Sequence, residues 1–179
     1  SSRANVGGAI GNNSCGAHSV LWGKTVDNVL EMRAVLSNGG VTTLGPVSEN
    51  ALVEKMRRDG LEADIHRMLA SIGESTRGEI NARYPKIMRR VSGYNLDELI
   101  VGEGFDTARF VVGSEGTLVT ITEAKLRIVP MPRSKSVAVL HFENMLESME
   151  AVVEILDLEP AAVELIDSMI IRQARTNLK

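Results

Sequence analysis

Residues 7–16, with the sequence GGAIGNNSCG, constrain the fold of this chain more than any other stretch. Four glycines, two adjacent asparagines and a cysteine fall within ten residues, and their order follows neither the period of a helix nor that of a half-buried strand. Glycine lets a backbone approach a ligand closely and adopt positive φ, and asparagine tolerates the same conformation. We therefore predict a loop laid against a flat or charged ligand, with a plain surface loop as the alternative.

Composition argues against several classes of function for the 179-residue chain. A net charge of -3 with scattered basic residues disfavours nucleic-acid binding, and no apolar run approaches the roughly 20 residues that span a bilayer. The single cysteine and three widely spaced histidines predict no metal site and a reduced, cytoplasmic setting, with peripheral attachment to the inner membrane left open. A start without Met and a helical pattern that runs to the last residue predict a piece of a longer protein.

Hydrophobic patterning predicts an α+β fold with a largely antiparallel sheet flanked by helices. Strand-like residues on both sides of Asn38-Gly39 predict a hairpin within residues 27–44, because both central positions of such a turn need positive φ. Helices are expected at residues 51–58, between Gly60 and Gly73, and near residues 86–91, followed by a turn at residues 92–95.

Strand character returns in the second half of the chain. We predict strands at residues 108–112 and 118–129, separated by the turn GSEGT at residues 113–117. Pro130 and Pro132 then end the sheet and mark a domain boundary. Beyond it we expect, in order, a strand at 136–142, a helix starting after Asn144, a strand at 161–166, and a helix capped by Asp167 or Ser168 that extends to about Thr176.

The sequence contains neither a GxGxxG fingerprint nor a P-loop. Its two glycine-rich motifs, residues 7–16 and 113–117, each lie beside strand-like sequence and can converge on one ligand. Together with residues 92–96 (SGYNL), these motifs resemble those of the FAD-linked oxidases of the vanillyl-alcohol oxidase and p-cresol methylhydroxylase (PCMH) superfamily. The similarity is greatest to the branch that contains D-lactate, glycolate and D-2-hydroxyglutarate dehydrogenases.

The resemblance implies a domain organisation. Residues 1–130 would form the second lobe of a PCMH-type FAD-binding domain, and residues 131–179 would begin an α+β cap domain that binds substrate. The lobe that carries the pyrophosphate loop would precede Ser1. We therefore expect that the 179 residues alone neither hold FAD tightly nor turn over substrate.

The resemblance also implies which residues face FAD, while no catalytic residue is assigned. In the first motif, along the isoalloxazine and ribityl part, they are Gly7, Gly8, Ile10, Gly11, Asn12, Asn13, Cys15 and Gly16. In the second motif they are Gly113, Ser114, Glu115, Gly116 and Thr117, and Ile121 would lie near the adenine end.

Several side chains have a functional and a structural interpretation. Cys15 is either a flavin attachment point or redox thiol, or a small buried group, and His18 is either a flavinylation site or a hydrogen-bonded structural histidine. Glu115 is a general base or a turn residue, and Tyr94 faces substrate or packs. Glu164 and Asp167 are interpreted as strand-end and cap residues.

The function implied by the resemblance is oxidation of a small D-2-hydroxy acid with hydride transfer to FAD, the electron acceptor being open. Another flavin reaction of the superfamily, of the alcohol oxidase or alkylglycerone-phosphate synthase type, is the second hypothesis. A structural or interaction module without flavin is the third.

Overall fold

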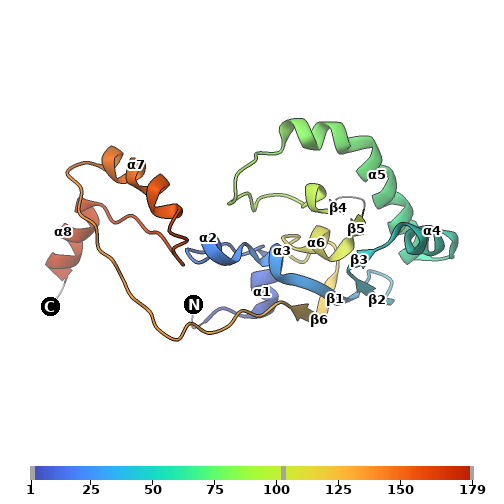
Figure 1. The fold of residues 1–179 in the computed structure, drawn as a ribbon. Helices are drawn as coiled ribbons and strands as arrows, with labels where there is room; N and C mark the ends of the chain where they lie inside the picture. Colours follow the sequence, from blue (N-terminus) through green and yellow to red (C-terminus); the bar gives the residue numbers. More distant parts are fainter. Residues whose placement is uncertain (1–2, 102–103, 178–179) are drawn as a thin grey trace. The chain divides into compact units, whose positions relative to one another are not determined.

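The computed structural model describes residues 3–101 and 104–177 (Figure 1). Its helices are α1 (Val6–Gly11), α2 (Ser19–Trp22), α3 (Thr25–Asn28), α4 (Glu49–Arg57), α5 (Leu61–Arg83), the 3-10 helix η1 (Leu96–Glu98), α6 (Thr107–Val111), α7 (Met145–Leu156) and α8 (Ser168–Asn177). Its strands are β1 (Val29–Val35), β2 (Val41–Leu44), β3 (Pro46–Val47), β4 (Ile100–Val101), β5 (Gly104–Asp106) and β6 (Thr120–Leu126). The predicted class, α+β with an antiparallel sheet flanked by helices, is confirmed.

The chain forms two compact units. The first contains the residues up to Cys15 together with Gly23–Ile128, and the second contains Gly16–Trp22 together with the residues from Val129 onward. Both sheets and the core belong to the first unit.

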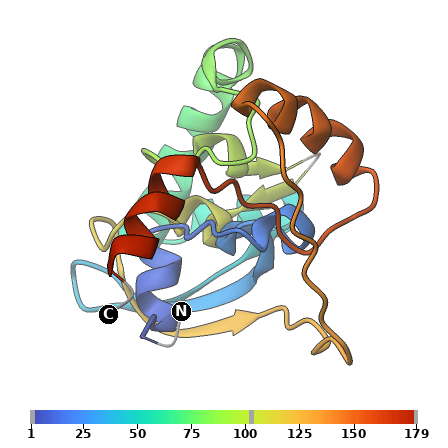
Figure 2. The same ribbon diagram turned by 90° about the vertical axis from the view of Figure 1, so that its left-hand side faces the viewer.

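The first sheet has the strand order β2-β1-β6, and both pairs are antiparallel. Figure 2 shows β6 running alongside β1. The hairpin predicted around Asn38-Gly39 is confirmed by the antiparallel pairing of β1 with β2. Gly39 has a φ of 81° and its N–H donates to the Leu36 carbonyl at 2.9 Å, whereas Asn38 does not adopt the positive φ expected of it. β6 is shorter than the predicted strand at 118–129.

The second sheet is a short antiparallel one with the order β3-β5-β4. It is joined to the first at Gly45, which lies between β2 and β3. The Gly45 N–H donates to Thr107 Oγ1 at 3.0 Å, and the Thr107 N–H donates to the Gly45 carbonyl at 3.1 Å. These two bonds fix the start of α6 against the sheets.

The strand predicted at residues 108–112 is wrong, because the chain forms helix α6 there. A five-residue run that is buried on nearly all sides has no period that separates strand from helix. The Asp106 side chain decides the outcome by accepting the Arg109 N–H at 3.0 Å, as an N-cap does.

The helix predicted to end at Gly73 continues to Arg83. Gly73 is buried inside α5, where a Cβ atom would lie 2.7 Å from Ile100 Cδ1, so this glycine permits close packing rather than ending the helix. The helix expected near residues 86–91 does not form. Pro85 favours an extended Tyr84, which has a ψ of 124°, and residues 86–91 make only a turn at Met88 and Arg89.

In the second unit both predicted helices are confirmed. Asn144 accepts the Glu147 N–H at 3.0 Å at the start of α7, and Asp167 accepts the Ile170 N–H at 2.8 Å at the start of α8. The strands expected at 136–142 and 161–166 do not form, and no other segment within residues 129–177 offers a ladder for them to join. An alternating pattern gives a strand only where a partner supplies hydrogen bonds.

The core of the first unit brings residues of α1, α3, β1 and α6 together. Ile10, Val26, Met32, Ala34 and Ala108 are each at most 1% exposed. Because Ile10 belongs to the first glycine motif, this core holds that motif against the sheet. Among the helices of the described residues, none is both long and apolar enough to cross a membrane.

Candidate cofactor site

The first glycine motif begins as a helix rather than as the predicted loop. The side chain of Asn5, just outside the motif, accepts the Gly8 N–H at 2.6 Å and caps α1 over Val6–Gly11. An N-cap offsets the low helix propensity of glycine over so short a segment. The helix ends at Gly11 with Asn12 as its C-cap, and Asn13 follows in the left-handed region with a φ of 47°.

The second glycine motif is a tight turn, as predicted. Gly113, Glu115 and Gly116 have φ values of 84°, 52° and 75°, and the Thr117 N–H donates to the Ser114 carbonyl at 3.0 Å. Three residues of positive φ within four positions reverse the chain between α6 and β6.

The two glycine motifs lie in direct contact. The Gly113 N–H donates to the Ile10 carbonyl at 2.9 Å, and the Glu115 N–H donates to the Gly11 carbonyl at 3.0 Å. A Cβ atom at Gly113 would lie 3.2 Å from Asn13 Cβ. These two amides bind the motifs to each other, so together the motifs form one surface.

Asn13 lies beneath that surface and is fully buried. Its Oδ1 accepts the Val26 N–H at 3.0 Å, and within the described chain its Nδ2 has no hydrogen-bond partner. The next residue, Ser14, accepts bonds from both the N–H and the hydroxyl of Thr25. The second half of the first motif is therefore anchored to α3.

The residues expected to face FAD divide by exposure. Those that are exposed are Gly7, Gly8, Asn12, Glu115, Gly116 and Thr117. Those that are buried are Ile10, Asn13 and Ser114, and those in between are Gly11, Cys15, Gly113 and Ile121. Ile121 pairs with Ala34 in the first sheet. Gly16 is exposed and belongs to the second unit.

The exposed glycines fit a ligand that lies against backbone. A Cβ atom at Gly116 would meet nothing within 4 Å, and one at Gly7 would meet only Asn5 Oδ1, at 4.0 Å. Neither glycine is needed for internal packing, so the space above both is open. The buried residues support this surface without being accessible to a ligand in this conformation.

A half-buried charge cluster, which the sequence analysis missed, adjoins the first motif through Val26. Arg109 donates to Glu98 Oε2 at 2.8 Å, to Asp27 Oδ1 at 3.3 Å and to the Val26 carbonyl at 3.2 Å. Burial alone would lower the pKa of Arg109, but the hydrogen bonds and negative charges of Glu98 and Asp27 outweigh it and raise that pKa. Because the Val26 N–H also donates to Asn13, Arg109 and the first motif bond the two backbone groups of the same residue.

The ambiguous side chains are placed as follows. Tyr94 OH lies 2.9 Å from Thr117 Oγ1, so Tyr94 touches the second glycine motif. In the second unit, the His18 ring stacks on Trp22, with 5.5 Å between centroids. Within the described ranges no three His, Cys, Asp or Glu side chains are grouped as metal ligands.

Comparison with known proteins finds a family match in the first part of the chain. Residues 1–45 match the family described as FAD binding domain. This match confirms the expected FAD cofactor, and the matched residues include the first glycine motif.

The whole chain is also related to named dehydrogenases. It is 31% identical over 181 residues to D-2-hydroxyglutarate dehydrogenase of Pantoea ananatis and 29% identical over 179 residues to that of Pseudomonas putida, covering 99% of this chain and 18% of each relative. It is 26% identical over 164 residues to glycolate oxidase subunit GlcD of Bacillus subtilis, covering 90% of this chain and 24% of the relative. The resemblance to FAD-linked oxidases is thus confirmed, and the chain spans less than a fifth of the length of the first two relatives.

Proposed function

We propose that this chain is the flavin-facing part of an oxidoreductase that oxidises a small D-2-hydroxy acid of the D-lactate, glycolate or D-2-hydroxyglutarate type. The observation that carries the proposal is the contact between the two glycine motifs through Gly113 and Ile10. It joins two segments of exposed small residues into one surface. The names of the relatives support the substrate class.

In this proposal the exposed residues bind and orient the flavin. Gly7 and Gly116 let backbone approach the ring system, and Asn12 and Thr117 offer polar side chains at the same surface. Bound FAD supplies the hydride acceptor. The buried Asn13 and Ser114 fix the backbone that the flavin contacts.

The proposal extends to the organisation and setting of the protein. Residues 1–130 form the second lobe of the FAD-binding domain, and residues 131–179 begin the cap that binds the hydroxy acid. The single cysteine supports a reduced, cytoplasmic location. Electrons pass from the reduced flavin to an acceptor outside this chain.

The test uses the full-length protein that contains this chain, reconstituted with FAD. Anaerobic addition of D-2-hydroxyglutarate, D-lactate or the achiral glycolate should bleach the visible absorbance of the flavin, and L-2-hydroxyglutarate and L-lactate should not. A protein that retains no FAD after reconstitution would refute a flavin enzyme. Bound flavin that none of these acids reduces would instead favour another reaction of the superfamily.

A matched pair of variants tests the surface itself. Gly7→Leu adds bulk where the cofactor is proposed to lie, whereas Gly78→Leu adds the same bulk to an exposed position of α5 with nothing within 4 Å. We expect Gly7→Leu to weaken FAD binding at least about tenfold without lowering the unfolding midpoint, and Gly78→Leu to leave FAD binding unchanged. Equal FAD affinity in the two variants would remove Gly7 from the site.

A further inference from the structure

Two neighbouring residues outside the glycine motifs form hydrogen bonds at the two ends of the second motif. Tyr94 and Asn95 lie between α5 and η1, and both belong to the first unit. Tyr94 reaches Thr117, the last residue of the turn, and Asn95 reaches Val112, the residue just before it. We call this pair the brace of the Gly113–Thr117 turn.

The bond at Thr117 has a defined direction. Thr117 Oγ1 donates its only hydrogen to the Ser114 carbonyl at 2.6 Å. The Tyr94 hydroxyl, 2.9 Å from Thr117 Oγ1, must therefore be the donor in that pair. The result is a chain of two hydroxyl hydrogen bonds, from Tyr94 to Thr117 and from Thr117 to the Ser114 carbonyl.

The bond at Val112 is buried. Asn95 is 1% exposed, and its Nδ2 donates to the Val112 carbonyl at 2.6 Å and to the Arg109 carbonyl at 3.3 Å. A Cβ atom at Gly113 would lie 3.7 Å from the same Nδ2. Asn95 thus fixes the peptide group that joins Val112 to Gly113, the residue at which the backbone adopts positive φ.

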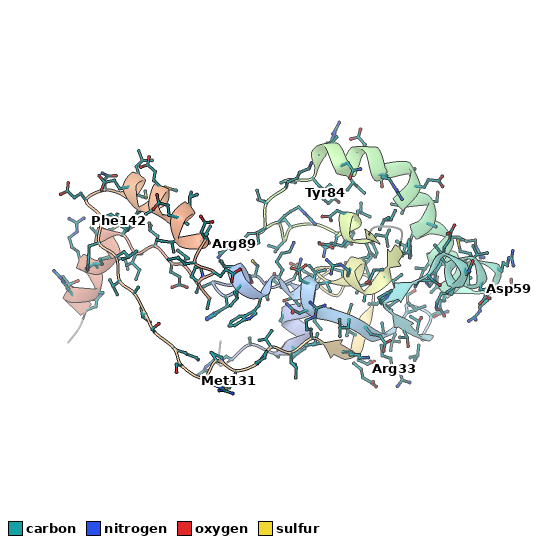
Figure 3. The ribbon with its side chains drawn as sticks, viewed as in Figure 1. Arg33, Asp59, Tyr84, Arg89, Met131 and Phe142 are labelled. Atoms are coloured by element: carbon teal, nitrogen blue, oxygen red, sulfur yellow. The ribbon has the colours of Figure 1, made fainter. Side chains whose placement is uncertain are left out.

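The brace is itself held in place. Arg90 donates to Asn95 Oδ1 at 3.5 Å and to Asp97 at 2.5 Å, which sets the orientation of the Asn95 amide. The Tyr94 ring packs at a tilt of 52° on Phe110 of α6. Tyr84, labelled in Figure 3 just after α5, donates to the Tyr94 carbonyl at 3.3 Å.

We propose that Tyr94 and Asn95 are positioning residues that set the Gly113–Thr117 turn for the flavin, and that neither is a catalytic residue. The inference rests on the proposed flavin site. Tyr94 is 44% exposed and Thr117 is also exposed, so the hydroxyl chain lies at the surface where the cofactor is expected. Loss of the Tyr94 hydroxyl would loosen the turn without removing a group from the core.

The first experiment measures the turn in the complete chain without FAD. In Tyr94→Phe, amide hydrogen exchange in a peptide covering residues 113–118 should become about fivefold faster, the expected effect of losing one neutral hydrogen bond. Exchange in β1 and β2 should not change. Thr76→Val is the control, because it removes a hydroxyl that donates within α5, to the Ile72 carbonyl at 2.6 Å, and it should leave residues 113–118 as protected as in the unaltered chain.

The second experiment measures the flavin. Tyr94→Phe and Thr117→Val should each raise the dissociation constant for FAD about fivefold and alter the visible circular dichroism of the bound flavin, and Thr117→Ser, which keeps the hydroxyl, should restore both. If the unaltered protein binds FAD and Tyr94→Phe binds it equally well with unchanged dichroism, the positioning role is refuted. If the unaltered protein binds no FAD, the proposed function fails, and the exchange experiment still decides whether the brace holds the turn.

Asn95 gives an independent test. Asn95→Asp keeps the shape of the side chain but places an oxygen against the Val112 carbonyl, so exchange at residues 113–118 should rise more than in Tyr94→Phe. An Asn95→Asp chain that folds with an unchanged turn would overturn the part of the inference that concerns Asn95. If Asn95→Asp fails to fold, Tyr94→Phe and Thr117→Val carry the test.

Discussion

The N–H of Gly113 donates to the carbonyl oxygen of Ile10 at 2.9 Å and so joins two motifs from opposite ends of the first unit. The bond brings the Gly113 Cα close to Asn13, leaving only 3.2 Å between Asn13 Cβ and a Cβ atom built at Gly113. Glycine is therefore required at position 113 for two separate reasons, its positive φ and the lack of space.

A pair of substitutions separates these two reasons. Gly116→Ala meets only the cost of positive φ, because nothing lies within 4 Å of its Cβ, and should lower the free energy of unfolding by about 1 kcal/mol. Gly113→Ala has the same cost of positive φ and also crowds Asn13, so it should lower the free energy of unfolding by about 2–3 kcal/mol. Urea unfolding of both variants checks the difference. Equal losses would mean that Asn13 moves aside freely.

Neighbouring asparagines provide the next comparison. Asn13→Ala leaves the buried Val26 N–H without its acceptor and removes a residue that tolerates positive φ, so we expect a loss of about 2–3 kcal/mol in the free energy of unfolding. Asn12→Ala alters an exposed side chain whose hydrogen bond to Ser14 is 3.5 Å long, and it should change the free energy of unfolding by less than about 0.5 kcal/mol. Thermal unfolding measures both. A tolerated Asn13→Ala would show that the buried amide does not anchor the first motif.

The ion pair of Arg109 with Glu98 should matter far more than the one between Arg33 and Glu123. The side chains of Arg109 and Glu98 are only 22% and 16% exposed, whereas those of Arg33 and Glu123 are 55% and 68% exposed. We expect Glu98→Gln to lower the free energy of unfolding by about 1–2 kcal/mol, because it leaves a half-buried guanidinium poorly paired.

Glu123→Gln is the matched control on the first sheet, and its effect should be below about 0.5 kcal/mol because solvent screens the pair. Urea unfolding of the two variants under the same conditions makes the comparison. A small loss in Glu98→Gln would mean that Asp27 and the Val26 carbonyl satisfy Arg109 without Glu98.

The elements that could be predicted from the sequence are those whose signals are local. The turn at Asn38-Gly39 and the caps Asn144 and Asp167 each act within three residues of the backbone groups they satisfy, so their residue types are sufficient evidence. Helix α6 could not be predicted, because its buried run has no period and one cap, Asp106, selects the helix. The strand expected at 136–142 does not form, for the opposite reason. Its alternating pattern is present, but no strand within residues 129–177 pairs with it.

The candidate site, too, could be predicted from the sequence only where its signals are local. Composition and spacing were enough to single out the two glycine motifs and to predict that the second is a turn. That Asn13 is buried, and that Tyr94 reaches Thr117, could not be predicted, because both depend on contacts between segments distant in sequence. A family resemblance names residues near a cofactor without separating those that face it from those that support them.

Glu62 makes the stability of α5 sensitive to acid. Burial alone would raise the pKa of Glu62, but hydrogen bonds from Lys55 at 2.7 Å and Thr42 at 2.9 Å, with the charges of Lys55 and His66, lower it below its ordinary value of 4.5. A carboxyl group with a lowered pKa contributes stability above its pKa in the unfolded chain, and that contribution disappears as the pH falls through its folded value.

We therefore expect Glu62→Gln to lower the free energy of unfolding by about 0.5 kcal/mol at pH 7, a small value because the Glu62 side chain is 38% exposed. The difference from the unaltered chain should shrink as the pH falls below 4.5 and should also shrink in 1 M salt, which screens the pair. Urea unfolding between pH 7 and pH 3, with the exposed Glu74 of the same helix changed to Gln as the control, measures the effect. A difference that stays constant with pH would assign the contribution of Glu62 to packing rather than to its charge.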